Sequence, residues 1–388
     1  MSKPLVLTCD IGTQSARALL VDPDGRIVDV VQSKYAEPYF SKEPGWAEQK
    51  PDFYFDRMCE CCRELCARSN ALLPDVIAMT ITVIRDTVVC LDENNNPLRD
   101  IILWLDKRSV DPNGAMPAKN MMVFKVAGME PTAKVVYAAS AGNWIMRHEP
   151  EIWAKTAKYV MLPTYLNYKL TGNLIDSASN QIGHIPFDYK NRRWMKPGSL
   201  TRCFCDVLNE KLCDLVPSGT VIGTITEEVC ALTGIPAGLP LISTGSDKGC
   251  ETLGLAVVDS DKASISLGTT ATIQFSTTQY VEPQQFLPAY PGVLNDHYNP
   301  EIEIYRGLWL LSWFVKEFGT ADAIDAKEMG MAPEALHDQR IRDLPAGSDG
   351  LLLQPYWTAG ILHPDSLGAV IGFSDYHTRY HFYRAIIE

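Results

Sequence analysis

The segment from residue 10 to residue 17 combines residue types that bind phosphate, and it reads Asp-Ile-Gly-Thr-Gln-Ser-Ala-Arg. A glycine at a tight turn lets backbone N–H groups point into one concavity, and Thr and Ser hydroxyls beside it add donors for phosphate oxygens. Arg17 adds positive charge, and Asp10 suits a hydrated Mg²⁺. An ordinary hairpin with an Asx turn uses the same residues, so this segment alone leaves both interpretations open.

A second turn of the same kind lies between two apolar runs in the last third of the chain, at Gly268-Thr269-Thr270. Repeated sequence units usually indicate repeated structure. This weak internal duplication favours two similar α/β lobes, each with a phosphate-binding turn, the two turns facing each other.

An apolar run ends in Gly245-Ser246-Asp247 before a helix of small residues. Open α/β sheets collect ligands at the carboxyl ends of their strands. Asp247 could therefore accept a proton from a substrate hydroxyl. Capping of the following helix is an equally common role for aspartate at such a position.

Arg85 and Asp86 lie between two expected strands, and Trp104 ends another. An Arg-Asp pair suits sugar hydroxyls, and an indole offers a flat apolar face to the carbon side of a polyol. A surface ion pair would explain the same charged residues without any function.

The elements that position these residues are expected to alternate between strands and helices. Short apolar runs predict a three-strand meander and two later strands, and three- and four-residue apolar spacing predicts a helix after Pro51. Residues 120–215 are expected to be mostly helical, broken at Pro131, Pro163 and Pro186, and a Gly/Pro-rich segment at 235–240 indicates a domain junction. The strands are expected at 5–9, 18–21, 27–31, 76–81 and 87–91.

The chain has 388 residues, more than one hydrophobic core usually serves, so two domains are expected. Apolar residues make up 46% and charged residues 21%, which excludes a disordered or collagenous chain. A net charge of −12 argues against nucleic acid or an anionic membrane as the main partner. Eleven cysteines without a secretory segment favour a reduced, cytoplasmic location, and their spacing does not support a zinc site.

The motifs together identify a family: the sequence resembles the FGGY carbohydrate kinases of the actin-like ATPase superfamily, which include glycerol, xylulose, ribulose and gluconate kinases. The matching stretches occur in the family's order and run nearly from end to end. They are 10–17, 44–49 (Pro-Gly-Trp-Ala-Glu-Gln), 85–89, 102–106, 170–172 (Leu-Thr-Gly), 245–247, 266–270 and 368–372 leading to 381–388.

The resemblance implies a role for each matched residue. Asp247 would be the catalytic base, Asp10 would position Mg²⁺ through water, and the two turns would bind the phosphates of ATP. The phosphate-binding residues implied are Gly12, Thr13, Gln14, Ser15, Arg17, Gly268, Thr269 and Thr270. The substrate-binding residues implied are Arg85, Asp86, Trp104, Tyr137, Asp247 and Lys248.

The resemblance also implies the fold and the reaction. We expect an α/β protein of two actin-like (ribonuclease H-like) lobes, each a mixed sheet flanked by helices, with residues 1–241 binding sugar and 242–388 binding nucleotide. The expected activity is ATP- and Mg²⁺-dependent phosphorylation of a sugar, polyol or sugar acid hydroxyl by a cytoplasmic enzyme, with a homodimer open as its assembly. The alternative is a catalytically inactive sugar-binding relative that acts as a sensor or partner protein.

Two departures from the family pattern carry further expectations. The family has an amide residue where this chain has Lys248, and a neighbouring ammonium would make Asp247 less basic or engage an anionic substrate group. With Arg85, this suggests a substrate that bears a carboxylate or another anionic group. The amphipathic segment 380–388 ends without a C-cap, so we expect a truncated second lobe and weak ATP binding.

Overall fold

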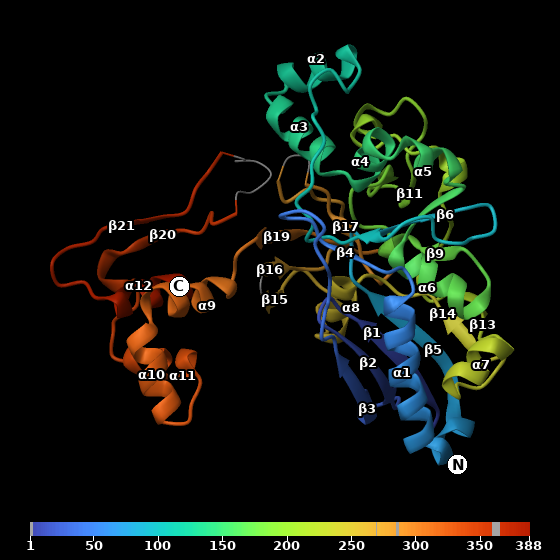
Figure 1. Cartoon of the computed structure of the whole chain (residues 1–388), viewed down its shortest axis with the longest axis horizontal. Coiled ribbons are helices and arrows are strands. Elements are labelled where there is room, and N and C mark those ends of the chain that lie inside the picture. Colours follow the sequence, from blue (N-terminus) through green and yellow to red (C-terminus); the bar gives the residue numbers. More distant parts are fainter. Residues whose placement is uncertain (1–2, 269, 285–286, 359–364) are drawn as a thin grey trace. The chain divides into compact units, whose positions relative to one another are not determined.

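The computed structural model describes residues 3–268, 270–284, 287–358 and 365–388. The chain forms two compact units (Figure 1): unit 1 comprises Met1–Lys262 and Ser276–Pro300, and unit 2 comprises Ala263–Phe275 and Glu301–Glu388. Residue 241, after which the sequence suggests a domain boundary, lies within a strand of unit 1. The boundary between the family's two lobes stays a prediction.

A mixed six-stranded sheet forms the centre of unit 1, in the order β13-β14-β5-β1-β2-β3. The meander expected from the first apolar runs is confirmed, since β1, β2 and β3 pair antiparallel in sequence. β5 runs parallel to both β1 and β14. The strands are β1 Leu5–Ile11, β2 Ser15–Val21, β3 Ile27–Lys34, β5 Val76–Val83, β13 Val221–Thr224 and β14 Pro240–Ile242.

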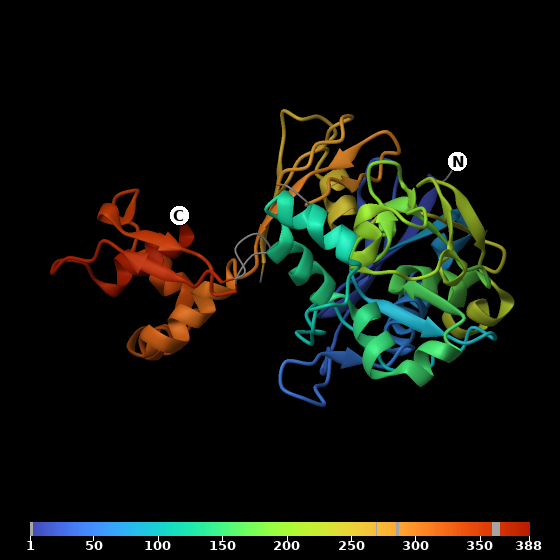
Figure 2. The ribbon, with the colours of Figure 1, turned by 90° about the horizontal axis from the view of Figure 1, so that it is seen from above.

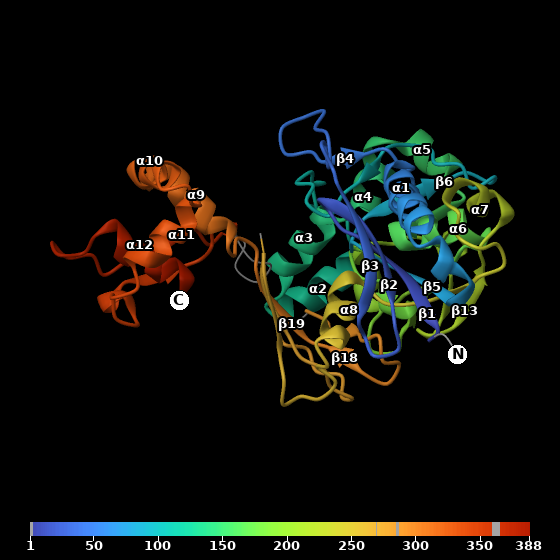
Figure 3. The same ribbon diagram turned by 90° about the horizontal axis from the view of Figure 1, so that it is seen from below.

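Helix α1 (Phe53–Arg68) lies along one face of this sheet, against β2 and β3 (Figure 3). Its buried stripe includes Cys59, Cys62 and Cys66, three of the residues whose spacing predicts one helix face. Burial of that apolar stripe is what holds an amphipathic helix on a sheet. α7 (Glu227–Thr233) packs beside α1 and ends at Gly234 in the left-handed conformation.

A second sheet of unit 1 is antiparallel throughout, in the order β4-β7-β6-β8. Its strands are β4 Glu48–Gln49, β6 Val88–Leu91, β7 Ile101–Ile102 and β8 Lys158–Met161. The helices that follow β7 in the chain are α2 Ala118–Val126, α3 Glu130–Ala139, α4 Ala141–His148, α5 Pro150–Lys155 and α6 Leu162–Thr171, and α6 packs against β6 and β8. Pro131 and Pro163 lie in the first turns of α3 and α6, where a missing N–H costs nothing.

The prediction that residues 120–215 are mostly helical is wrong after residue 171. That stretch forms short strand pairs and single 3₁₀ turns, because its apolar residues serve several small contacts and not one helix face. The strands of these pairs are β9 Ile175–Ser177, β10 Phe187–Asp188, β11 Arg193–Trp194 and β12 Asp214–Val216. The 3₁₀ turns include Ala178–Asn180, Leu200–Phe204 and Asn209–Lys211. Unit 1 is completed by α8 Asp247–Gly254, β17 Tyr290–Pro291, β18 Tyr298–Asn299 and the turn Asn70–Asp75.

Unit 2 opens with a small antiparallel sheet in the order β15-β16-β19, which repeats the hairpin of β1 and β2. Helices α10 and α11 pack against α9, all drawn in orange in Figure 2. The elements are β15 Ser264–Leu267, β16 Ala271–Gln274, β19 Glu301–Ile304, β20 Leu352–Gln354, β21 Ala369–Ile371, α9 Trp309–Phe318, α10 Thr320–Glu328, α11 Pro333–Arg340, α12 Arg379–Ile387 and the turn Ser348–Gly350.

Candidate functional site

Three parallel strands of unit 1 bring the predicted residues to one edge of the six-stranded sheet. β1, β5 and β14 lie side by side and run in the same direction, with Ile11 paired to Val83. Their carboxyl ends therefore meet, and such an edge is where open α/β sheets bind ligands. The first turn follows β1, Arg85 and Asp86 follow β5, and Asp247 follows β14.

The first turn is a hairpin whose polar groups already have partners. The Gly12 N–H donates to the Ser15 carbonyl at 3.0 Å and closes the turn. Arg17 donates to Asp10 across the hairpin at 2.6 Å, and the two side chains are 41% and 35% exposed. A phosphate group at this turn would therefore have to compete with Asp10 for the Arg17 guanidinium.

Asp247 is the first residue of α8, and Ser246 caps that helix by accepting a hydrogen bond from the Gly249 N–H at 3.3 Å. The capping role that the sequence leaves open for Asp247 thus belongs to Ser246. Gly245 permits the close packing before it, because a Cβ there would lie 2.7 Å from a methyl group of Val293. Asp247 keeps a quarter of its side chain exposed.

Burial raises the pKa of Asp247 above its ordinary value. Arg85, whose Nε lies 3.6 Å from Asp247 Oδ1, lowers that pKa, and Lys248 lowers it less. Lys248 lowers the pKa of Asp247 as expected, but desolvation of the carboxylate outweighs the neighbouring charges and the net shift is upward. The Lys248 ammonium lies 2.8 Å from the Glu251 carboxylate, which adds its own negative charge near Asp247.

Asp86 pairs with His184, a residue that no sequence pattern marks. The His184 backbone N–H donates to Asp86 Oδ1 at 2.9 Å, and its ring Nδ1 lies 2.7 Å from Asp86 Oδ2. Burial disfavours the Asp86 carboxylate, but His184 and Arg85 outweigh it and leave the pKa of Asp86 lowered. Arg85 faces Asp247 and the ring of Tyr290.

Trp104 connects the end of β7 to the first turn, since its indole Nε1 donates to Thr13 Oγ1 at 2.9 Å. Its side chain is exposed and offers a flat apolar face. Tyr137 lies on α3 and packs with the apolar cluster of Met116, Phe124 and Ala133. The structure thus joins Trp104 to the first turn and places Tyr137 in a separate cluster.

The second turn belongs to unit 2 and connects β15 to β16. The Gly268 N–H donates to the Thr270 carbonyl at 3.1 Å, as the Gly12 N–H does to Ser15 in the first hairpin. Thr269 lies outside the described residues. In both turns a glycine N–H donates across the turn, and the facing arrangement of the two turns stays a prediction.

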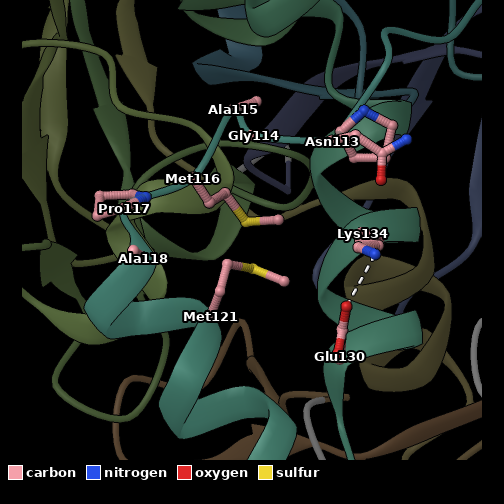
Figure 4. Close-up of a pocket in the computed structure, with 10 residues that line it drawn as sticks. Asn113, Gly114, Ala115, Met116, Pro117, Ala118, Met121, Glu130 and Lys134 are labelled. Carbon is pink, nitrogen blue, oxygen red and sulfur yellow. Dashed lines mark ion pairs between the residues drawn. The ribbon is translucent and has the colours of Figure 1, made fainter.

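Two hollows in unit 1 lie away from these residues. The larger, of about 630 Å³, is lined by 112–118, Met121, Glu130 and Lys134, and Figure 4 shows Met116 and Met121 directed toward one another. The Glu130–Lys134 ion pair of 2.8 Å borders it. The other, of about 450 Å³, is lined by a charged set that includes Lys42, Arg99 and Asp100. Neither contains a residue predicted from the sequence to act on substrate.

The chemistry of the donor set at the carboxyl edge fits a hydrated Mg²⁺ and phosphate. Asp10 supplies a carboxylate, Thr13 a hydroxyl, and Arg17 a partly exposed guanidinium within one hairpin. Among the described residues no cluster of three or more His, Cys, Asp or Glu side chains forms a protein-only metal site. Mg²⁺ characteristically uses one or two carboxylates together with phosphates and water.

None of the helices in the described part of the chain has the length and apolar character that crossing a membrane requires.

Comparison with known proteins shows which family and fold the chain resembles. An uncharacterised sugar kinase of Escherichia coli K12 is 25% identical over 389 residues, covering 100% of this chain and 71% of its own length. The xylulose kinase of Bacillus subtilis is 25% identical, over 99% of this chain and 74% of its own. The crystal structure of gluconate kinase from Lactobacillus acidophilus matches with a TM-score of 0.80 at 22% identity, over 99% of this chain and 75% of that chain.

That structural match confirms the expected α/β fold of two actin-like lobes. The model of the FGGY family of carbohydrate kinases, N-terminal domain, matches residues 5–254, well over half of the chain. Members of that family are phosphotransferases that act on a sugar hydroxyl. The chain belongs to the FGGY family of carbohydrate kinases.

Proposed function

We propose that this chain transfers the γ-phosphoryl group of ATP to a hydroxyl of a sugar, polyol or sugar acid, with Asp247 as the general base. One observation carries the proposal: Asp247 stands at the carboxyl edge of three parallel strands, partly exposed, with its pKa raised by burial. A carboxylate whose pKa is raised is a better proton acceptor, which is what a general base requires.

In the proposed reaction, the oxygen of the substrate hydroxyl attacks the γ-phosphorus. A carboxylate oxygen of Asp247 accepts the proton of that hydroxyl as the attack proceeds. The bond between the γ-phosphorus and the bridging oxygen of ADP breaks. Phosphoryl transfer depends mainly on positioning and on neutralising charge, so one base and two phosphate-binding turns suffice. Mg²⁺, when bound, would supply charge neutralisation, and Asp10 would hold it through water.

The turns would divide the work on the phosphates. In unit 1 the donors are those of 12–15 and Arg17, and in unit 2 they are those of 268–270. Because Arg17 pairs with Asp10 in this structure, nucleotide binding would exchange that ion pair for contacts to phosphate and to the hydrated cation. This exchange lets one hairpin serve both ligands.

We propose that the substrate is bound by Asp247 and by five further residues: Arg85, Asp86, Trp104, Tyr137 and Lys248. The positive charges among them decide whether a carboxylate-bearing substrate is expected. Lys248 is paired with Glu251, so the cation next to the base is Arg85, with its guanidinium over the Tyr290 ring. We keep a sugar acid as the preferred substrate on the strength of Arg85, and a neutral ketose or polyol as the competing one.

The test is an ATP-consumption assay of the purified chain with D-gluconate, D-xylulose and xylitol, applied to wild type and Asp247→Asn. We expect turnover by wild type and a loss of about 10²–10⁴-fold in kcat for the variant, with sugar binding retained. Asp52→Asn is the matched control, an aspartate at the start of helix α1 that accepts a hydrogen bond from Tyr165.

Near-normal kcat in Asp247→Asn would remove Asp247 as the base. Sugar binding by wild type without any ATP consumption would favour the inactive sugar-binding alternative. Neutral substrates that far outperform D-gluconate would overturn the sugar acid preference.

A further inference from the structure

Asp86 is held in a conformation that most residues avoid. Its φ is 46°, in the left-handed region that is uncommon for residues other than glycine. Its N–H donates to the Ile182 carbonyl at 3.1 Å, so the chain segment around residue 183 lies directly against it. A backbone held this way needs support from its surroundings, and segment 182–184 provides it.

Gly183 makes the approach possible. A Cβ at residue 183 would lie only 2.2 Å from Asp86 Oδ1, and the φ of Gly183 is +148°. Any side chain there would expel the Asp86 carboxylate. The Tyr189 hydroxyl accepts from the Gly183 N–H at 3.1 Å and donates to the Gly183 carbonyl at 3.0 Å, which fixes this segment further.

The next residue, His184, holds both oxygens of Asp86, one through its backbone N–H and one through ring Nδ1. An ionised carboxylate only accepts hydrogen bonds, so Nδ1 carries the hydrogen in this pair. Each carboxylate oxygen retains a second lone-pair direction, and the other ring nitrogen, Nε2, points away from Asp86. The side chains of His184 and Asp86 are 29% and 30% exposed, so both keep some contact with solvent.

The pair is continuous with the candidate base through a row of aromatic contacts. The Tyr189 ring packs edge-on against Tyr290 at 5.5 Å, and the Arg85 guanidinium lies 5.6 Å from the centre of the Tyr290 ring. Arg85 in turn reaches Asp247. These contacts link His184 and Asp86 to Asp247, the residue proposed to activate the substrate. We call this set of side chains the wall of unit 1.

We propose that His184 is a further substrate-contacting residue, and that it and Asp86 together recognise hydroxyls of the sugar other than the one that is phosphorylated. Ring Nε2 contacts one hydroxyl, and Asp86 accepts a hydrogen bond from a second. The inference rests on the proposed function, since it assumes a polyhydroxy substrate at this wall. It adds a residue that selects substrates carrying the additional hydroxyls.

Three variants of His184 separate contact from support. Asparagine places an amide donor near the Nδ1 position but does not reach that of Nε2, glutamine reaches Nε2, and alanine reaches neither. The control is His297→Asn, because His297 Nδ1 makes a similar 2.7 Å pair with Asp296 in unit 1. Calorimetric binding of D-gluconate, D-xylulose and xylitol, each without ATP, gives the dissociation constants, and steady-state assays give kcat and KM.

For the ligand that wild type binds best, we expect His184→Asn and His184→Ala to raise Kd and KM by about 10- to 100-fold, the effect of losing one hydrogen bond in a site built for it. We expect kcat at saturation to stay within about threefold, because the base is untouched. His184→Gln should recover part of the affinity, and His297→Asn should bind like wild type. The melting temperature of each variant shows that it is folded, and His184→Asn carries the test if the alanine variant is not.

Wild-type affinity in His184→Asn would overturn the contact and leave His184 as support for Asp86 only. A fall in kcat with unchanged Kd would also overturn it. These results differ from failure of the proposed function, which would appear as an active Asp247→Asn enzyme or as a wild type that neither binds nor phosphorylates any of the three compounds. In the latter case the inference falls with the function on which it rests.

Discussion

At the scale of single residues, the environment of Asp247 decides its chemistry more than its sequence neighbours do. The sequence places a lysine next to it, and that lysine alone predicts a lowered pKa. In the fold, desolvation dominates, Arg85 opposes it, and Glu251 adds to it. Burial depends on which strands surround the residue, so the net direction could not be predicted from the motif.

The balance between burial and Arg85 is testable through the pH dependence of kcat/KM. A general base works when deprotonated, so activity falls as the pH drops through the pKa of Asp247. Arg85 lowers that pKa, so Arg85→Met should raise it and move the acid limb toward higher pH, along with any increase in KM. Arg192→Met is the control, because Arg192 also lies over a tyrosine ring, at 4.4 Å from the centre of Tyr298. An acid limb that stays in place, or moves to lower pH, would contradict the assigned pairing.

Asp86 and His184 lie 98 positions apart in the sequence, and no local pattern predicts their contact. The two turns and Asp247 follow local patterns, since a glycine between two short strands specifies a hairpin wherever it stands. The contact between Asp86 and His184 depends on the path of the chain between them. That path includes the stretch after residue 171, where the helical prediction is wrong, so His184 could not be assigned to the site.

At the scale of elements, the site exists because β14, β5 and β1 run parallel and end together. Each strand could be predicted from its own apolar run, but their order could not, because parallel neighbours are joined by long connections. The segment after β9 then supports the edge: the Ser179 carbonyl accepts from the Ser246 N–H at 3.2 Å, next to Asp247.

The support of that segment centres on Asp176, whose side chain is fully buried. Its Oδ1 accepts from the Ser177 N–H and Asn180 Nδ2, both at 2.8 Å, and its Oδ2 accepts from the Thr164 hydroxyl at 2.9 Å. These donors are neutral, so burial prevails and raises the pKa of Asp176 to about 6. The folded state therefore holds a proton more tightly than the unfolded state, and this contribution to stability is present at acid pH and is lost as the pH rises through about 6.

Asp176→Asn removes that titration. Between pH 5 and pH 8, we expect the free energy of unfolding of wild type to fall by about 1 kcal/mol more than that of the variant, as the shift in pKa implies. The variant also places an amide N–H₂ toward donors, so it should be less stable at pH 5. Urea unfolding at both pH values measures the two slopes. Parallel slopes would show that Asp176 stays ionised across this range.

At the scale of the whole molecule, each unit has its own core. The buried apolar clusters of the described chain are confined to one unit each, with the cluster around Phe314, Phe382 and Tyr383 in unit 2. Two domains could be predicted from length alone, because one core rarely serves so many residues. The chain passes between the units more than once, so the division could not be found as a single linker in the sequence.

Asp322 provides a test of whether the units can be weakened separately. It lies on α10, is fully buried, and accepts hydrogen bonds from Arg340 at 2.6 Å and from Arg379 at 2.9 Å, which join α11 and α12 to α10. Removing the Asp322 carboxylate takes away the shared acceptor of the Arg340 and Arg379 guanidinium groups. Because they are 33% and 41% exposed, water offsets part of the loss, and we expect Asp322→Ala to cost about 2–3 kcal/mol, below the range for a fully buried pair.

Hydrogen exchange followed by mass spectrometry would locate that loss. We expect peptides from α9 to α12 to lose protection in Asp322→Ala, while peptides from α1 keep theirs, because the two sets belong to different cores. Asp325→Ala is the matched control on the same helix, since Asp325 binds the same Arg340 at 2.7 Å but is 49% exposed, where an ion pair contributes little. Equal loss of protection in α1 and in α9 to α12 would show that the two cores unfold as one cooperative unit.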